Sequence, residues 1–320
     1  MSERFVTATA EDPGAGPLDI AGRAPALDLD VRWIHGHPRG SPNVDPPIHV
    51  HAADAHTFIL RQSMAVSHEA PYLYLLLGND RALLIDTGAT ANADRFPLRI
   101  TVDGIIEAWL ERHPRARHEL VIAHSHGHAD HTAADAQFDE RPDTTLIPPD
   151  PAAMATAFDM PGWPDGTGRL DLGGRVLEVI ATPGHHPSAI TVFDPWTGFL
   201  LTGDTIYPGR LFVADSRAYV ASLGRLESFA AERRISFVMG CHVEMSSVPG
   251  RDYPMGARYQ PEELPLPMTP DRLGAVRSAM AAVAHRRGVH PFDDFIIYNR
   301  PRLWSLLRVI ARSLRHRLSG

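Results

Sequence analysis

Four histidines and one aspartate stand within eight residues, in a stretch that reads H-S-H-G-H-A-D-H from position 124 to 131. Neutral imidazole and carboxylate are the ligands that Zn²⁺ and similar cations take in proteins. His126 and His128 lie two residues apart on a predicted extended loop, so they can converge on one ion. Asp130 and His131 open the next predicted helix and point elsewhere, which suits a second ion. A histidine-rich loop in solvent is the alternative, which the register H-x-H-x-D-H disfavours.

Short polar motifs follow predicted strands at five places in the chain. The buried strand predicted at residues 120–123 delivers the histidine-rich loop and can hold it rigidly. The other motifs are L-I-D-T-G at 84–88, T-P-G-H at 182–185, T-G-D at 202–204 and G-C-H at 240–242. Five motifs in a fixed order are far more specific than any one of them alone.

In this order and spacing the chain resembles the metallo-β-lactamase-fold superfamily of metallohydrolases, over roughly residues 55–245. The resemblance implies an α/β fold, the four-layer αββα sandwich of that superfamily, with a C-terminal helical extension. It also implies two metal sites and a structural aspartate, Asp86, that supports them. The implied ligands are His126, His128 and His185 for one ion and Asp130, His131 and His242 for the other, with Asp204 bridging.

The motif pattern is most similar to the lactonase and glyoxalase II-like members of the superfamily. It implies a dinuclear hydrolase, with two zinc ions per chain, whose bridging hydroxide attacks an ester, lactone or thioester carbonyl. Asp130 is then expected to orient the hydroxide and carry its proton. Iron and manganese accept the same ligands. The zinc β-lactamases lack a bridging aspartate at the motif of Asp204, which disfavours antibiotic hydrolysis. A mononuclear iron oxidoreductase similar to the persulfide dioxygenases is the alternative.

Two residues near Asp204 are candidates for contact with the substrate. Tyr207 has a spacing similar to that of lactone-hydrolysing members, and we predict that it donates to the substrate oxygen; a tyrosine packed on the sheet is the alternative. Arg210 is predicted to anchor an anionic group, with an ordinary surface arginine as the alternative. All 31 basic residues are arginine, so arginine alone can provide such an anchor. His124 and His186 are expected to lie beside ligands rather than to bind metal.

Composition narrows the class of protein. A hydrophobic content of 44% in 320 residues allows a sizeable core, and a net charge of −7 argues against a nucleic-acid binder. The single cysteine, Cys241, excludes an intramolecular disulfide. No signal-peptide pattern and no run of eighteen apolar residues is found, so we predict a cytoplasmic enzyme that acts on a small molecule.

The chain divides into three parts by pattern. Residues 1–45 are predicted to be a loosely ordered arm, 46–260 the metallo-β-lactamase-like domain, and 261–320 a helical extension. Residues 302–318 form a basic amphipathic pattern. We expect this segment to pack on its own domain or on a second subunit of a homodimer, rather than on a membrane surface.

Periodicity predicts the elements that position the motifs. Strands are predicted at residues 57–61, 72–77, 82–85, 120–123, 144–147, 176–180, 189–193, 199–201 and 237–239. Helices are predicted at residues 103–113, 219–233 and 271–287, together with a helix that begins near Asp130.

Overall fold

A computed structural model describes residues 17–19 and 25–301, and most of its strands belong to two sheets. The first contains β1 (Ile48–Asp54), β2 (Thr57–Gln62), β3 (Tyr72–Leu77), β4 (Arg81–Ile85), β5 (Glu119–Ala123) and β6 (Thr144–Leu146), in that spatial order. The second contains β7 (Gly168–Asp171), β8 (Val176–Ala181), β9 (Ile190–Asp194), β10 (Phe199–Gly203), β12 (Phe237–Gly240) and β13 (Pro267–Met268), in the order β13-β12-β10-β9-β8-β7.

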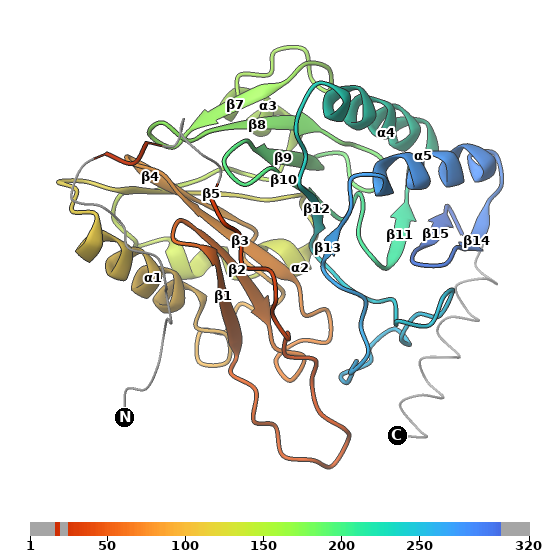
Figure 1. Ribbon diagram of the computed structural model, residues 1–320, viewed down its shortest axis with the longest axis horizontal. Helices are drawn as coiled ribbons and strands as arrows, with labels where there is room; N and C mark the ends of the chain where they lie inside the picture. Colours follow the sequence, from red (N-terminus) through yellow and green to blue (C-terminus); the bar gives the residue numbers. More distant parts are fainter. Residues whose placement is uncertain (1–16, 20–24, 302–320) are drawn as a thin grey trace.

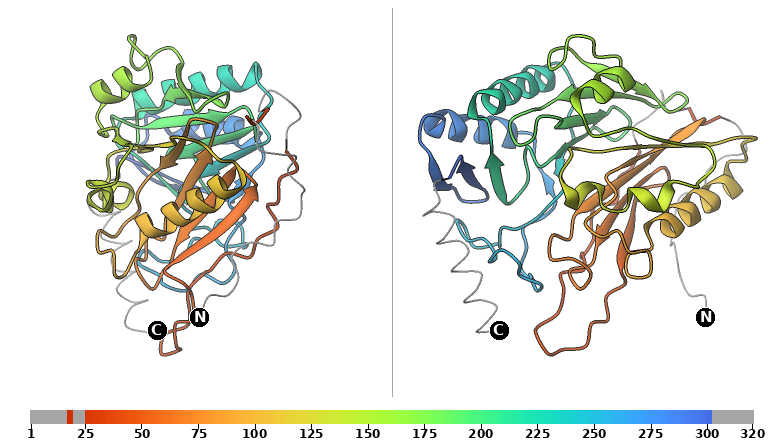
Figure 2. Two further views of the ribbon diagram at one scale, coloured as in Figure 1. Left: turned by 90° about the vertical axis from the view of Figure 1, so that its left-hand side faces the viewer. Right: turned by 180° about the vertical axis from the view of Figure 1, so that it is seen from behind.

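Helices cover the outer faces of both sheets (Figure 1 and Figure 2). The elements outside the two sheets are α1 (Leu98–Arg112), α2 (Ala129–Thr132), the 3₁₀ helix η1 (Asp135–Phe138), α3 (Pro151–Ala157), α4 (Ser216–Ala231), α5 (Arg272–Val283), and a small third sheet of β11 (Arg210–Val213), β14 (Gly288–Pro291) and β15 (Ile296–Asn299). Because α1 packs on the first sheet and α4 and α5 on the second, the predicted αββα sandwich is confirmed.

The period-two alternation of the strands explains this layering. In β3, Tyr74 and Leu76 belong to the cluster of buried residues between the sheets, whereas Leu75 and Leu77 pack with Trp109 of α1. Successive side chains of a strand point to opposite faces, so a strand covered on both sides is apolar at every position. All six residues of β3 are accordingly buried.

Strand direction brings the polar motifs to one place. β5 runs parallel to β4, and β12 runs parallel to β10. β8 and β10 are both antiparallel to β9, so these two also share a direction. Each of the five motifs therefore follows the carboxyl end of a strand, where loops commonly carry the functional residues of α/β folds.

Helix boundaries differ from the predicted ones by up to five residues: α5 ends four residues early, α4 begins three residues early, and the largest difference is at the start of α1. The helix begins at Leu98, five residues before the predicted start, because Leu98 and Val102 bury apolar surface that a stripe beginning at Asp103 leaves out. The helix at Asp130 is a single turn. The strands predicted from residues 57 to 239 all form, with ends that shift by one or two residues.

The described part of the N-terminal arm lies on the body of the protein. Leu27, Leu29 and Trp33 pack against the core between the sheets. Residues 261–301 supply three strands besides α5, and β15 pairs with β11. The predicted basic helix at 302–318 lies outside the described residues. No helix in the described ranges is long and apolar enough to cross a membrane. The three-part division, the cytoplasmic location and the homodimer stay predictions.

A buried ion pair at strand ends of the second sheet is hydrogen-bonded to strand ends of the first. Arg175 and Asp194 are each at most 1% exposed, and the guanidinium binds the carboxylate at 2.6 Å. The same guanidinium donates to the carbonyls of His56 and Leu77 and to the hydroxyl of Thr57, all in or beside the first sheet. Removing one partner of such a pair leaves the other charge buried and unpaired.

We therefore expect Arg175→Met to lower the free energy of unfolding by about 3–5 kcal/mol, the size measured for broken buried pairs. Urea unfolding followed by circular dichroism measures it. Arg169→Met, at an exposed arginine of the neighbouring strand β7, is the control and should change the stability by less than about 0.5 kcal/mol. Equal stability of the two variants would contradict this role of Arg175.

Candidate metal centre

Three histidines form the first group at the strand ends. Nε2 of His126 lies 2.8 Å from Nδ1 of His128, and Nε2 of His185 lies 3.2 Å and 3.0 Å from these two atoms. His126 and His128 come from the loop after β5, and His185 comes from the loop after β8. The structure thus brings together the three residues that the resemblance implied for one ion.

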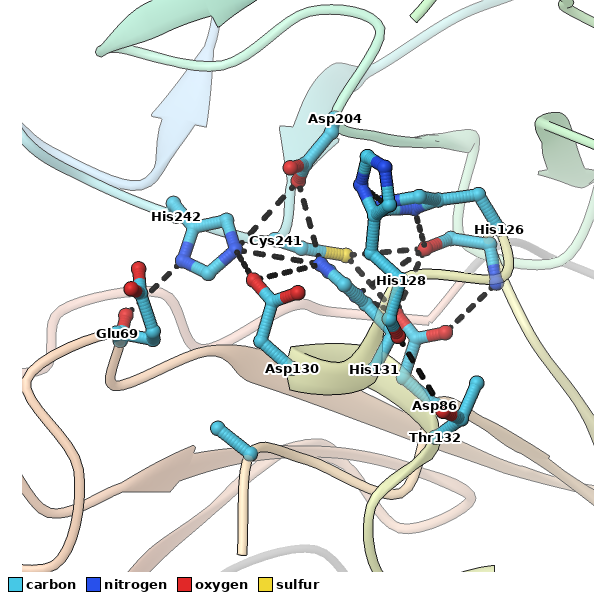
Figure 3. Close-up of polar contacts among 12 residues, drawn as sticks. Glu69, Asp86, His126, His128, Asp130, His131, Thr132, Asp204, Cys241 and His242 are labelled. Carbon is cyan, nitrogen blue, oxygen red and sulfur yellow. Dashed lines mark hydrogen bonds and ion pairs between the residues drawn. The ribbon is translucent and has the colours of Figure 1, made fainter. Parts of the chain in front are cut away.

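Asp130, His131 and His242 form the second group. Nε2 of His242 lies 3.3 Å from Nε2 of His131, and Oδ2 of Asp130 lies 3.4 Å from Nε2 of His131 and 3.5 Å from that of His242. Asp130 and His131 sit in the single turn of α2, while His242 follows β12. Figure 3 shows the three side chains converging.

Asp204 stands between the two groups. One carboxylate oxygen, Oδ2, lies 3.6 Å from Nε2 of His185, and the other, Oδ1, lies 3.7 Å from His131 and 3.6 Å from His242. In Figure 3 the carboxylate lies between His242 on one side and His128 on the other. Oδ1 is buried and accepts no hydrogen bond. An orphaned carboxylate oxygen is costly unless a cation compensates it.

Hydrogen bonds on the far side of each ring aim a lone pair at the centre. Nδ1 of His185 lies 2.8 Å from the carbonyl of Phe212, and Nδ1 of His242 lies 3.0 Å from that of Glu69. Since a carbonyl only accepts, both Nδ1 atoms carry a hydrogen, and in the neutral rings Nε2 is a lone pair. This arrangement is typical of metal-binding histidines.

The residues present fit a pair of metal ions. Tetrahedral coordination at metal–nitrogen distances of about 2.0–2.1 Å places ligand atoms about 3.3 Å apart, close to the spacings between these nitrogens. Imidazole and carboxylate ligands suit zinc, iron and manganese. A pair of cations would accept the inward-facing nitrogens together with the buried oxygen of Asp204.

Asp86 holds the histidine loop in place. Its carboxylate accepts from the backbone N–H of Ser125 at 2.7 Å, from the Ser125 hydroxyl at 2.8 Å and from Nδ1 of His131 at 2.8 Å. Asp86 has a positive φ of 68°, and the buried thiol of Cys241 lies 3.2 Å from its Oδ2. This matches the supporting role that the resemblance implied.

Ser125 is a supporting residue that the sequence analysis missed. Its hydroxyl lies 3.2 Å from Nδ1 of His126 as well as against Asp86. Gly203, which precedes Asp204, has a φ of 52°, and a Cβ there would lie 2.6 Å from that of Ser125. The role of this serine follows from its contacts between the ends of β5 and β10, which the sequence alone does not show.

In the metal-free protein, the pKa values of histidines are lowered in the first group and raised in the second. Burial lowers the pKa of His126 and His185. Burial also acts to lower the pKa of His242, but the carboxylates of Asp204 and Asp130 outweigh it and raise that pKa to about 9. The pKa of His131 is raised well above its usual value, since Asp86 and Asp204 outweigh burial.

Tyr207 and Arg210 lie beside the centre with their polar groups already engaged. The Tyr207 hydroxyl donates to the carbonyl of Arg210, and the Arg210 guanidinium binds Glu244 and Asp252. Arg210 is 5% exposed, so it is not a surface arginine. Both residues line the cavity described below, but their catalytic and substrate-binding roles stay predictions, which these bonds do not favour.

Four other histidines lie outside the two groups, two beside the centre and two remote from it. Nδ1 of His124 lies 3.1 Å from the carbonyl of His131, and the ring of His186 packs edge-on against that of His128. His51 and His56 lie away from the centre, against Trp33 and Trp109 respectively.

A cavity of about 670 Å³ opens onto both groups. Its lining includes His128 and His185 of the first group, Asp130 and His242 of the second, and Asp204. This volume lies in the range of pockets that hold small organic ligands. A small molecule can therefore reach both groups from the same side.

The comparisons with known proteins agree with this geometry. A model of the metallo-beta-lactamase superfamily matches residues 69–236, just over half of the chain. The chain belongs to the metallo-beta-lactamase superfamily. The matched range contains six of the seven residues assigned to the two groups and to Asp204, while His242 lies six positions beyond it.

Curated relatives of this chain are named hydroxyacylglutathione hydrolase. The chain is 32% identical to one from Rhizobium meliloti over 157 residues, which are 47% of this chain and 57% of that protein. It is 29% identical to one from Idiomarina loihiensis over 133 residues, 41% of this chain and 50% of that protein. One from Chromohalobacter salexigens is 28% identical over 220 residues, which are 64% of this chain and 79% of that protein. The chain thus spans little more than half the length of the first two relatives.

Solved structures that resemble the chain are metallo-beta-lactamases at low identity. One from Pontibacter korlensis is 18% identical, with a TM-score of 0.45 over 61% of this chain and 91% of that one. The crystal structure of a metallo-beta-lactamase exposed to ceftazidime is 13% identical, with a TM-score of 0.49 over 74% of this chain and 98% of that one.

We predict that Asp86→Asn weakens the binding of one zinc ion per chain by about 10–100-fold, the usual cost of losing a partner of a metal-binding histidine. Asparagine replaces one of the two carboxylate oxygens with an NH₂ group, which cannot accept a hydrogen bond. The bonds from the Ser125 N–H and from Nδ1 of His131 therefore cannot both be kept. Competition with a chromogenic chelator measures the two affinities. Asp139→Asn, at an exposed aspartate, is the control and should bind zinc as the wild type does. Unchanged affinity in Asp86→Asn would show that Asp86 does not support the site.

Zinc affinity should rise with pH between 7 and 9. Because the pKa of His242 is raised to about 9, this ring carries a second proton at pH 7, and zinc must displace it in order to bind. As the pH rises, a smaller fraction of the protein molecules carries this proton. Chelator competition at several pH values, with the chelator's own protonation corrected, measures this slope. A flat affinity between pH 7 and 9 would contradict it.

Proposed function

We propose that the protein is a dinuclear metal hydrolase, with zinc as its metal, that cleaves an ester, lactone or thioester of a small molecule. The observation that carries this proposal is the position of Asp204, whose two oxygens face two separate groups of ligands at the floor of one cavity. A single-metal centre needs no such second group.

The reaction adds water across the acyl bond. A bond forms between the water oxygen and the acyl carbon, the carbon–oxygen or carbon–sulfur bond breaks, and the leaving group takes a proton, which yields a carboxylate and an alcohol or thiol. When bound, the metal pair supplies water that ionises near neutral pH and polarises the carbonyl.

The chain's own residues position these reactants. Asp130 lines the cavity and lies within 3.5 Å of His131 and His242, so its carboxylate is placed to orient water. The pKa of Asp130 is held well below its usual range, because hydrogen bonds from these histidines outweigh the effect of burial, which raises it. This carboxylate is therefore ionised at neutral pH.

The relatives named hydroxyacylglutathione hydrolase support a thioester among the candidate substrates. Their names describe a hydrolysis at an acyl–sulfur bond, and six of the seven residues that we assign as ligands in this chain lie inside the region that the family model matches. The cavity volume of about 670 Å³ suits a small-molecule substrate.

Metal removal and replacement test the proposal. We expect chelated protein to lose hydrolysis of p-nitrophenyl acetate, a γ-lactone and S-lactoylglutathione, and two equivalents of zinc to restore it for at least one of them. His128→Ala should fail to recover, whereas the control His51→Ala, at a histidine remote from the centre, should recover fully. One iron per chain with oxygen consumption would instead identify the mononuclear oxidoreductase.

Tyr207→Phe should lower kcat less than about tenfold. The hydroxyl has one hydrogen to donate and gives it to the carbonyl of Arg210, whereas removing a true oxyanion donor costs about 10²–10³ in kcat. Steady-state kinetics of the zinc-loaded variant measure the effect. A loss of 10² or more, with an unchanged zinc content, would show that Tyr207 turns toward the substrate during catalysis.

A further inference from the structure

A second cavity, of about 890 Å³, lies next to the cavity of the metal centre. The two cavities have His68 and Gly256 in common as lining residues. Met64 and Met255 line the first cavity, while Ala65 and residue 258 line the second, so the same two chain segments separate them. A substrate held at the metal centre therefore has a second space beside it for a part that does not react.

One wall of the second cavity is a loop of the N-terminal arm, residues 36–43. This loop belongs to the red-to-orange segment that precedes β1 in Figure 1. Gly36 forms an antiparallel bridge with Tyr259, in the opposite wall. Gly36 has a φ of 74°, and a Cβ there would lie 1.9 Å from the carbonyl oxygen of Arg258. The backbone of the arm therefore contacts the backbone at residues 258–259 more closely than any residue with a Cβ would allow.

The far end of the loop is also held. Nε2 of His37 lies 3.1 Å from a carboxylate oxygen of Asp45, across the base of the loop. Beyond it, the backbone N–H of Ser63 donates to the carbonyl of Pro47 at 2.9 Å. Contacts at both ends define the shape of the loop, so the second cavity has a built wall.

Among the described residues that line the second cavity, the side chains with a permanent charge are both arginines. Arg39 and Arg258 line it, together with His37 and His68. Among the described residues that line it, none is an aspartate or a glutamate. The chain as a whole has a net charge of −7, so this set of side chains is a local exception. Arginine groups suit carboxylate and phosphate, which they bind in a forked geometry.

Arg258 is available to a ligand in a way that Arg210 is not. Its Nη1 donates to the backbone carbonyls of Met64 and Ala65, each at 3.1 Å, and in the part of the chain that the structure describes it forms no ion pair. The guanidinium of Arg210 is instead bound by two carboxylates. The anionic anchor predicted at Arg210 thus fits Arg258 better, on the other side of His68.

We propose that the second cavity binds an anionic group, a carboxylate or a phosphate, on the non-reacting part of the substrate. Arg258 and Arg39 hold this group while the acyl carbon lies at the metal centre. The inference rests on the proposed function and adds the substrate class, an ester or thioester whose non-reacting part ends in an anion.

Matched thioesters test the inference. The zinc-loaded protein is assayed with acetyl thioesters whose thiol part ends in a carboxylate, in a phosphate, or in the neutral primary amide of the same carboxylate. The carboxylate and phosphate arms distinguish the two sources of charge. We expect kcat/KM for at least one anionic thioester to exceed that for the neutral one at least tenfold, and added salt to reduce the difference.

Variants locate the binding group. Arg258→Gln and Arg39→Gln should each raise KM for the preferred anionic thioester about tenfold, the size of one charge-assisted hydrogen bond, and leave kcat and the neutral thioester unchanged. Arg258→Lys should recover part of the loss. Arg112→Gln, at an exposed arginine of α1, is the control and should match the wild type. Gly36→Ala should also lose the preference for the anion, since it displaces the arm while zinc content stays at wild-type level.

Two outcomes separate this inference from the proposed function. Equal kcat/KM for anionic and neutral thioesters, or an anionic preference unaffected by Arg258→Gln and Arg39→Gln, overturns the anion-binding cavity while hydrolysis stands. If no thioester is hydrolysed, calorimetric titration with the S-propyl thioether of 3-mercaptopropionate still tests the cavity, and the proposed function itself fails only if p-nitrophenyl acetate and the γ-lactone are not hydrolysed either. Binding that Arg258→Gln weakens about tenfold supports the anion-binding cavity, and no binding overturns it.

Discussion

Lone pairs that face one another at close range repel, and this repulsion is the constraint on which the structure depends. The nitrogens of His126, His128 and His185 converge within about 3 Å, and a buried oxygen of Asp204 has no hydrogen-bond donor. A cation placed among such groups turns the repulsion into attraction. The fold can hold this arrangement because the ligands sit at the ends of strands that are buried on both faces.

The support of the centre comes from groups distant in sequence. The carbonyl of Glu69 fixes the ring of His242, and the carbonyl of Phe212 fixes that of His185. Asp86 plays the same part for His131 from the end of β4. These supports come from the first and the small third sheet, whereas the ligands themselves follow strands of both large sheets, so a shift of one large sheet against the other would misalign the two groups. The buried pair of Arg175 and Asp194 resists such a shift.

Much of this could be predicted from sequence because it is local. A strand followed by a polar motif is visible within ten residues, and the family pattern assigned each ligand. What pattern could not supply depends on contacts across the fold. Examples are the hydrogen bonds to backbone carbonyls, which leave no trace in residue type, and β15, a four-residue strand that forms through its pairing with β11. The carboxylates that bind Arg210 are 34 and 42 residues away in sequence, so these ion pairs could not be predicted from the local pattern either.

Anomalous diffraction at the zinc edge, from crystals of the zinc-loaded protein, tests the central claim most directly. The account predicts two peaks per chain, one among His126, His128 and His185 and one among Asp130, His131 and His242, with the carboxylate of Asp204 between them. A single peak, or a peak at the thiol of Cys241 beside Asp86, would contradict it.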